Sequence, residues 1–322
     1  MGFNNQEECR MSRPLVRLLV VGGTGFIGRH IVNYAAKLGW EVTSLNLSLS
    51  YDKFERSASV RYLYEDITNS TALKQALESN AFEYVVNCSG YIDHTLFFSG
   101  GGNVFDTHFG GVLNLVKILD REVLQAFINI GSSDEYGNTP APQIETQREV
   151  PISPYSLGKV TATHFLQMLW RTERLPALTL RPFLVYGPGQ DEKRFLPQII
   201  QGCLENRHFP VSEGGQLRDF CYVDDIVEGI FCALDTPAVF GRVINLASGT
   251  PATIREVIER VRDIIGQGQP VFGKIPYRTG ENMALWADTN LARELLGWAP
   301  RVKLNEGLAR TVEYYKREKS AI

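Results

Sequence analysis

Apolar runs of strand length alternate along the chain with stretches in which apolar residues recur at helical spacing. Alternating strands and helices whose strands are apolar throughout predict a parallel sheet that is covered by helices on both faces. The first strand is predicted at 18–21. Further strands are predicted at 41–47, 60–64, 82–87 and 127–130, and helices at 31–38, 68–77, 104–119 and 153–171.

The first apolar run opens into a glycine-rich turn, GGTGFIG, before the first helix begins. Gly22 permits a tight turn, Gly25 leaves room for phosphate groups, and Gly28 lets the helix pack closely on the strand. Backbone amides at the helix start, at Phe26 and Ile27, then face an anion. A glycine trio between a strand and a helix indicates a bound dinucleotide.

In such a fold, the residue at the end of the second strand determines the preference for NAD or NADP. An acidic side chain there binds the ribose hydroxyls of NAD and repels the 2′-phosphate of NADP. This chain has the neutral Asn46, followed by Ser48, Ser50 and Lys53. The pattern favours NADP(H) by a narrow margin. NAD(H) stays open, because Asn46 is equally interpreted as a turn residue.

Two further turns are predicted to line the dinucleotide. Asp66 and Ile67 follow the third strand, where an acidic residue accepts a hydrogen bond from the adenine amino group or caps the next helix. Cys88 and Ser89 follow the fourth strand, where small residues let the backbone pass beneath the cofactor.

Tyr155 and Lys159 are one helical turn apart and project from the same helix face. An ammonium group close to a phenol is expected to lower its pKa towards the range of a general acid and base. Ser132, at the mouth of the preceding strand, is placed to hold a substrate oxygen. Ser132, Tyr155 and Lys159 follow a glycine-rich turn in the sequence, and this combination is specific enough to predict redox chemistry.

Composition narrows the class of protein. The 322 residues are 44% hydrophobic and suit one large α/β domain, or a large domain with a smaller partner. A net charge of −3 gives no general attraction to nucleic acid or to an anionic membrane. No apolar stretch is long enough to span a bilayer. The five cysteines include no C-x-x-C pair, which speaks against a disulfide framework or a metal site and fits the cytoplasm. Residues 1–13 are predicted to be a disordered extension.

Several motifs together resemble one family. GGTGFIG, GSSDEYG and YSLGK are followed by RPFLVYGPGQ, RDFCYVDDIVEGI, RTGEN and LGWAP. In this order they resemble the extended short-chain dehydrogenase/reductases that act on nucleotide sugars, the NAD-dependent epimerase/dehydratase family. The resemblance implies a doubly wound Rossmann domain over 14–185, with returning segments near 219–248. A smaller C-terminal α/β domain, formed by 186–218 and 249–322, would bind the sugar nucleotide.

The same resemblance implies roles for individual residues. Tyr155 would be the acid and base, Lys159 would bind the nicotinamide ribose, and Ser132 would bond the reacting sugar oxygen. Ser133 and Asp134 would contact the substrate. Arg218 and Arg278 would hold its diphosphate, because guanidinium groups suit phosphates; the alternatives are a salt bridge at the domain interface for Arg218 and a solvated turn for Arg278.

Two positions depart from the family pattern. His108 stands where many relatives have asparagine, and Leu184 replaces the asparagine of the N-x-Y-G-P element. A histidine on an otherwise apolar helix is more often structural than catalytic.

The loop after the fifth strand bears on the reaction. Ser133 falls where 4,6-dehydratases of nucleotide-glucose carry an acid, which weakens a dehydratase assignment. The residues of the GSSDEYG motif most resemble those of reductases of GDP-4-keto-6-deoxymannose. It predicts an enzyme that reduces the C4 keto group of a nucleotide-linked 4-keto-6-deoxyhexose. Alternatives are a nucleotide-sugar 4-epimerase, a 4,6-dehydratase, a reductase of small carbonyl compounds, and a non-enzymatic sensor or scaffold that binds a dinucleotide.

A homodimer is also predicted. The helices at 104–119 and 160–170 carry long apolar faces, and in relatives the corresponding helices form a four-helix bundle between subunits. The alternative is that these faces only pack on their own sheet.

Overall fold

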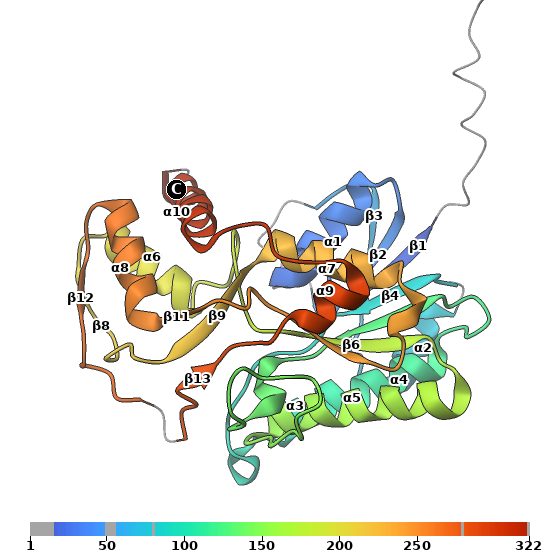
Figure 1. Cartoon of the computed structure of the whole chain (residues 1–322). Helices are drawn as coiled ribbons and strands as arrows, with labels where there is room; N and C mark the ends of the chain where they lie inside the picture. The colour runs from blue at the N-terminus through green and yellow to red at the C-terminus, as the bar shows by residue number, and fades with distance from the viewer. Residues whose placement is uncertain (1–15, 49–55, 79–80, 278–279, 321–322) are drawn as a thin grey trace, which may run out of the picture.

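A sheet of seven parallel strands forms the centre of the larger part of the molecule (Figure 1). The computed structural model describes residues 16–48, 56–78, 81–277 and 280–320; the predicted extension 1–13 lies outside them. The spatial order of the strands is β10-β6-β5-β4-β1-β2-β3, and every neighbouring pair is parallel. The strands are β1 (Arg17–Val21), β2 (Glu41–Asn46), β3 (Val60–Tyr64), β4 (Tyr84–Asn87), β5 (Ala126–Ile130), β6 (Ala177–Pro182) and β10 (Val243–Leu246).

Helices cover both faces of this sheet, which confirms the predicted doubly wound fold (Figure 1). Leu18 and Val20 of β1 contribute to the core on one face, and Leu19 and Val21 to the core on the other. Because side chains alternate along a strand, burial on both faces requires the continuous apolar run seen in the sequence. One layer holds α1 (Phe26–Lys37), α7 (Val223–Leu234) and α9 (Asn290–Leu296), and the other holds α2 (Ser70–Leu77), α4 (Gly111–Ile118) and α5 (Pro154–Glu173).

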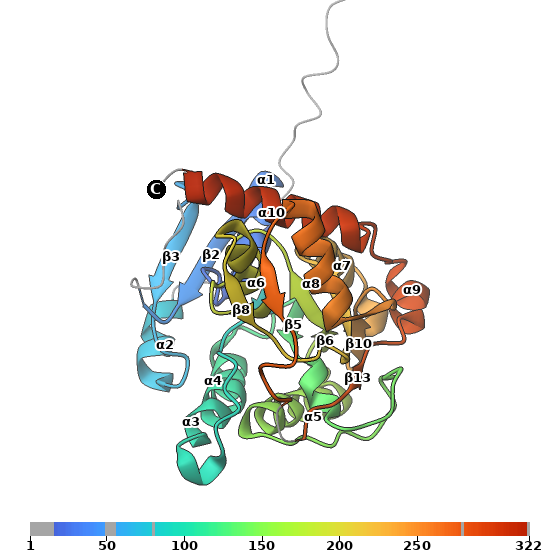
Figure 2. The same ribbon diagram turned by 90° about the vertical axis from the view of Figure 1, so that its left-hand side faces the viewer.

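A smaller α/β part lies beside the carboxyl ends of the large sheet, and Figure 2 looks onto it. Its centre is β9 (Leu217–Tyr222), which pairs with β7 (Leu184–Tyr186), β11 (Pro251–Thr253) and β13 (Ala284–Leu285). A separate core containing Ile200, Val257 and Leu308 joins these strands to three helices. The remaining elements here are β8 (His208–Pro210), β12 (Gln269–Val271), α6 (Phe195–Leu204), α8 (Ile254–Ile265) and α10 (Leu304–Ser320).

The segment 249–322 does not stay within the smaller part. Its helix α9 and Trp298 pack into the core of the large sheet, against α7 and β10. The Trp298 indole donates a hydrogen bond of 2.9 Å to the Asp225 carbonyl. The domain boundary predicted at 249 therefore differs from the observed packing, because the chain returns to cover an apolar face that only the folded sheet creates.

Two predicted helices begin or run differently. The helix predicted at 68–77 starts at Ser70, since the Asn69 side chain accepts a hydrogen bond from the Ala72 amide. Asp66 therefore does not cap it, and that alternative is wrong. The helix predicted at 104–119 is α3 (Gly102–Phe105), a π-helical segment η3 (Asp106–Gly110) and α4 in succession.

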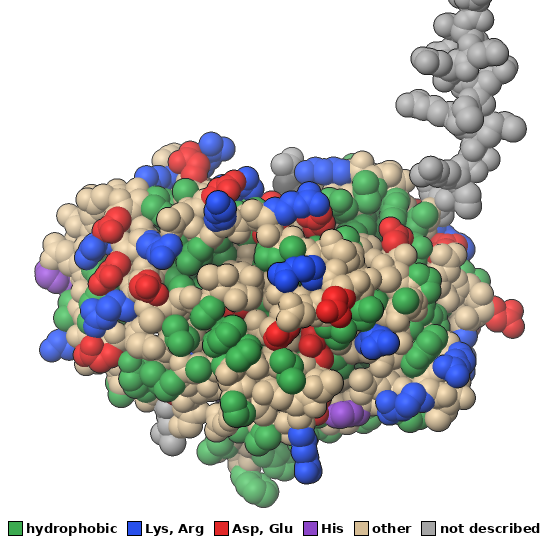
Figure 3. Space-filling model, viewed as in Figure 1, with side chains coloured by type: hydrophobic (Ala, Val, Ile, Leu, Met, Phe, Trp, Pro, Cys, Tyr) green, Lys and Arg blue, Asp and Glu red, His purple; other side chains and the backbone are tan. Residues whose placement is uncertain are grey.

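None of the helices in the described ranges combines the length and the apolar character that crossing a membrane requires. On the face seen in Figure 3, basic and acidic side chains are intermixed. This distribution agrees with the small net charge of −3.

Candidate functional site

The predicted cofactor turn lies at the carboxyl end of β1, where the first helix begins. Gly22 has φ of +78°, and a Cβ at Gly28 would lie 2.1 Å from the Gly22 carbonyl oxygen. Only glycine allows this close approach of α1 to the turn. Gly25 precedes α1, and no side chain caps the helix. The first amides of α1, at Phe26 and Ile27, therefore have no capping side chain, and amides at such a helix start suit an anion.

Asn46 is buried behind this turn and its amide is engaged by protein atoms. Its Oδ1 accepts a hydrogen bond of 2.8 Å from the Thr24 amide, and its Nδ2 donates to Ser44 Oγ at 3.0 Å. Asn46 thus fixes the glycine turn. Ser50 and Lys53, on which the preference for NADP(H) also rested, lie outside the described residues.

The other predicted cofactor residues lie on neighbouring turns of the same sheet edge. Asp66 Oδ1 accepts hydrogen bonds from the Thr68 amide and hydroxyl at 2.8 and 2.7 Å. Ile67 is buried in the core beneath α4. A Cβ at Gly22 would lie 3.0 Å from the Cys88 carbonyl group, so the turn after β4 lies directly against the glycine turn. Ser89 donates a hydrogen bond of 2.5 Å to Asn87 Oδ1.

Ser132 and Tyr155 meet at the carboxyl end of β5. Ser132 caps the short 3-10 helix η4 (Ser133–Tyr136), and its Oγ accepts a hydrogen bond of 3.1 Å from the Asp134 amide. Helix α5 begins beside it, because Ser153 forms a capping box and Pro154 occupies the first turn. Tyr155 follows at once and is only 4% exposed.

Lys159 lies one turn further along α5 and is buried. Its Nζ donates a hydrogen bond of 2.6 Å to the carbonyl of Ile130, the last residue of β5. Burial lowers the pKa of this ammonium group to about 8, although the negative charge of Glu135 opposes the shift. Lys159 is therefore anchored at the strand end that also carries Ser132.

The pKa of Tyr155 is raised, first by burial and then by the charges of Asp134 and Glu135. A hydrogen bond with Ser132 and the charge of Arg194 act in the opposite direction. The expected lowering of the phenol pKa is thus wrong in direction for this arrangement. Spacing placed Lys159 on the right helix face but could not reveal how deeply the phenol is buried.

Sequence reasoning missed a buried ionic network behind Ser132. Glu135 Oε1 accepts a hydrogen bond of 2.8 Å from the Ser132 amide. Its Oε2 accepts from Thr163 at 2.9 Å and from the Arg181 guanidinium at 2.8 Å. The only available signal was an arginine at the end of an apolar strand, which a buried acidic partner explains.

Two histidines flank the Tyr155 ring in edge-on contacts. The ring centroid of His108 lies 5.0 Å from that of Tyr155, and the centroid of His94 lies 5.7 Å from it. His108 Nε2 is 2.9 Å from the Tyr91 carbonyl oxygen, so this nitrogen carries the proton. Burial lowers the pKa of His108 to about 3 and keeps it neutral. His94 was not anticipated, because it lies in a segment without regular structure.

The predicted diphosphate arginines are only partly described. Arg218 on β9 forms an ion pair with Glu281 and donates a hydrogen bond of 2.8 Å to the Leu217 carbonyl. The alternative expected for Arg218 was a salt bridge between the two domains, whereas this ion pair lies within the smaller part, because Glu281 precedes β13, which pairs with β9. Arg278 lies outside the described residues. Leu184, the other departure from the family pattern, lies in β7 opposite Phe220 of β9.

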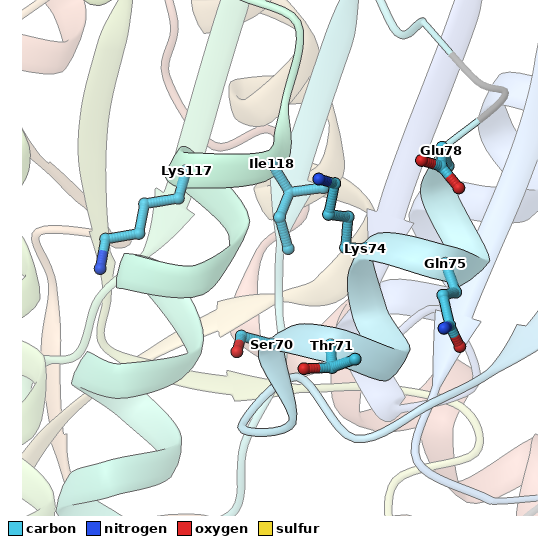
Figure 4. A pocket seen from close by; sticks show the side chains of 7 residues that line it. All are labelled: Ser70, Thr71, Lys74, Gln75, Glu78, Lys117 and Ile118. Carbon is cyan, nitrogen blue, oxygen red and sulfur yellow. The ribbon is translucent and has the colours of Figure 1, made fainter.

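A surface hollow between α2 and α4 is separate from this site (Figure 4). None of the predicted site residues lines it. Its lining residues are Ser70, Thr71, Lys74, Gln75, Glu78, Lys117 and Ile118.

Comparison with known proteins identifies a matching family model and several similar proteins. A family model described as "NAD dependent epimerase/dehydratase family" matches residues 18–247. The chain is 27% identical to a UDP-glucuronate 4-epimerase of Thermodesulfobacterium geofontis, with 92% of this chain and 95% of the relative covered. It is 26% identical to a dTDP-glucose 4,6-dehydratase of Xanthomonas campestris, with 92% of each covered.

Two solved structures are similar over nearly the whole chain. UDP-glucose 4-epimerase of Thermotoga maritima, solved with UDP-glucose, has a TM-score of 0.88 at 27% identity, covering 94% of this chain and 100% of that one. UDP-glucuronic acid 4-epimerase of Bacillus cereus, solved with UDP-glucuronic acid and NAD, has a TM-score of 0.84 at 26% identity, with the same coverage.

Proposed function

The chain belongs to the NAD dependent epimerase/dehydratase family, and on that premise we propose that it inverts the configuration at C4 of a UDP-hexose with bound NAD. One observation carries the proposal. The Ser132 side chain acts on the Tyr155 phenol at the carboxyl end of the sheet and favours its ionised form, and Lys159 is anchored at the same strand end. Ser133 supplies a hydroxyl where a dehydratase needs an acid.

Each of the three residues has a distinct task in this reaction. When bound, NAD supplies the chemistry of accepting hydride from C4 and returning it to the opposite face. Tyr155 takes the proton of the C4 hydroxyl during oxidation and gives it back during reduction. Ser132 holds the C4 oxygen throughout, and Lys159 binds the nicotinamide ribose.

NAD is proposed in place of NADP because Asn46 is already engaged by the glycine turn and by Ser44. The Bacillus cereus epimerase, at 26% identity, was solved with NAD. The amides of Phe26 and Ile27 would bind the pyrophosphate, and Asp66 would approach the adenine. Cys88 and Ser89 would lie beneath the dinucleotide.

A UDP-sugar is proposed because the Thermotoga maritima enzyme was solved with UDP-glucose. Reduction of a 4-keto-6-deoxy sugar, predicted from the spelling of GSSDEYG, has weaker support, since the similar proteins are epimerases and dehydratases. A sensor without catalysis would have no need for Ser132, Tyr155 and Lys159 together.

The three reactions differ in products and in cofactor consumption. With catalytic NAD, the purified protein is expected to interconvert UDP-glucose and UDP-galactose with no net formation of NADH. Chromatography of the sugar nucleotides and absorbance at the NADH band measure both quantities. Formation of a 4-keto-6-deoxy product would identify a dehydratase. Stoichiometric loss of NADPH with a 4-keto-6-deoxy substrate would identify a reductase, and either result contradicts the proposal.

We also infer a homodimer that forms through the outer faces of α4 and α5. Leu157 and Met168 on α5 expose 46% and 38% of their surface, which leaves apolar area for a second copy. Light scattering is expected to give about twice the mass of the chain. Replacing Leu157 with glutamate should shift the protein to monomer, whereas an unchanged mass in that variant would place the interface elsewhere.

A further inference from the structure

The segment that carries His94 is held in place on both sides, although it has no regular secondary structure. The His108 Nε2 atom donates a hydrogen bond of 2.9 Å to the Tyr91 carbonyl oxygen. Asp93 Oδ1 accepts a hydrogen bond of 2.8 Å from the Thr95 amide. A Cβ at Gly101 would lie 2.0 Å from the Thr95 carbonyl oxygen, so α3 begins directly against this turn. The neutral His108 therefore helps to hold the start of the segment that carries His94.

His94 lies opposite Asp134, and its ring contacts the ring of Tyr155. The His94 Nε2 atom lies 3.7 Å from Asp134 Oδ2, and the His94 ring meets the Tyr155 ring at an interplanar angle of 79°. The side chains of His94 and Asp134 expose 43% and 33% of their surface. A ligand can therefore reach this pair, whereas Glu135, the next residue, is fully buried.

A sugar bound for reaction must place one oxygen within reach of both Ser132 and Tyr155. Asp134 lies on the same turn as Ser132, and its charge acts directly on the Tyr155 phenol. We therefore expect substituents on the two ring carbons beside the reacting carbon to come close to His94 and Asp134. An imidazole and a carboxylate together can donate to and accept from a hydroxyl group. A carboxylate on the sugar would instead face the carboxylate of Asp134.

From this juxtaposition we infer that His94 and Asp134 determine specificity by selecting a neutral hexose over a uronic acid. The inference deepens the proposed function and rests on it. It separates this chain from the UDP-glucuronate 4-epimerase to which it is similar. His94 and Asp134 bind hydroxyl groups next to the reacting carbon and exclude a carboxylate by like-charge repulsion.

The test compares UDP-glucose with UDP-glucuronic acid on the NAD-loaded protein. Dissociation constants come from calorimetry, and kcat and KM from chromatography of C4 epimers. The wild type is expected to prefer UDP-glucose by about tenfold or more in both quantities. Asp134→Asn should reduce this preference at least about fivefold, mainly by improved binding of the uronic acid.

The histidine is tested by the split between KM and kcat. His94→Ala is expected to raise KM for UDP-glucose about tenfold and to change kcat by less than about threefold. His94→Gln, which keeps a hydrogen-bonding group, should recover part of that loss. His208→Ala and Asp263→Asn are matched controls on exposed positions of the smaller part and should leave both constants unchanged.

Failure of the inference and failure of the proposed function give different results. Equal use of both sugars by the wild type, or an unchanged preference in Asp134→Asn, overturns the inference while the epimerase assignment stands. Preferential binding of UDP-glucose without C4 epimerisation overturns the proposed function and keeps the specificity assignment. Binding of neither sugar nucleotide overturns both.

Discussion

Replacing Tyr155 with phenylalanine is expected to lower kcat about 10³-fold, since general acid–base catalysis contributes about 10²–10⁴-fold. The Tyr155 phenol is the group on which the Ser132 side chain acts at the sheet edge. Burial and the charges of Asp134 and Glu135 raise the pKa of this phenol, and phenylalanine removes the hydroxyl that would take and return the C4 proton. Steady-state kinetics with UDP-glucose and UDP-galactose measure the loss.

The variant should retain its fold and its ligands. Phenylalanine keeps the ring that packs against His94 and His108, so the dissociation constant for UDP-glucose is expected to change less than about threefold. Tyr315→Phe is the matched control, because Tyr315 is also buried and donates its hydrogen bond of 2.6 Å to the Gln190 carbonyl and not to one of the proposed catalytic residues. Equal kcat values in Tyr155→Phe and in the control would remove Tyr155 from the chemistry.

The Rossmann half could be predicted from sequence because its determinants are local. Strands buried on both faces are apolar without interruption, and β1 shows this in four consecutive buried residues, Leu18 to Val21. Gly28 is dictated by contact with Gly22, six positions earlier. Spacing also placed Tyr155 and Lys159 on one helix face beside Ser132.

Features that depend on distant partners could not be predicted. Asn46 was interpreted by its position at a strand end, but its partner is the Thr24 amide, 22 residues earlier. Glu135 was part of a motif, and its guanidinium partner lies 46 residues further on. The direction of the Tyr155 pKa shift follows from burial, which helical spacing does not encode.

The order of the elements along the chain also gave no indication that α9 packs on the large sheet. A stretch of apolar residues near 291–298 is compatible with packing on either part. This segment lies on the large sheet because the Trp298 indole donates a hydrogen bond to the Asp225 carbonyl. The two Asp225 carboxylate oxygens also accept hydrogen bonds from the amides of Arg301 and Val302. Buried polar groups that need partners thus fix where the segment docks.

The second large effect is expected at Arg181, which is fully buried together with Glu135. Its guanidinium donates to Glu135 at 2.8 Å and to Glu149 at 2.6 Å, and it lies 4.6 Å from the centre of the Tyr136 ring. Arg181→Met would leave the Glu135 carboxylate buried without its counter-charge. Removing one partner of a buried pair costs about 3–5 kcal/mol of unfolding free energy. Urea denaturation followed by circular dichroism measures it.

Two further variants separate loss of a charge partner from loss of packing. Arg121→Met breaks an ion pair with Glu173 in which both side chains are about half exposed, and should cost less than about 1 kcal/mol. Glu135→Gln combined with Arg181→Met removes both buried charges and should be more stable than Arg181→Met alone. Glu135 also accepts a hydrogen bond of 2.8 Å from the Ser132 amide. Because a change at Glu135 therefore reaches Ser132, Arg181→Met should lower kcat as well as stability. A free energy of unfolding equal to that of Arg121→Met would contradict the assigned role of this network.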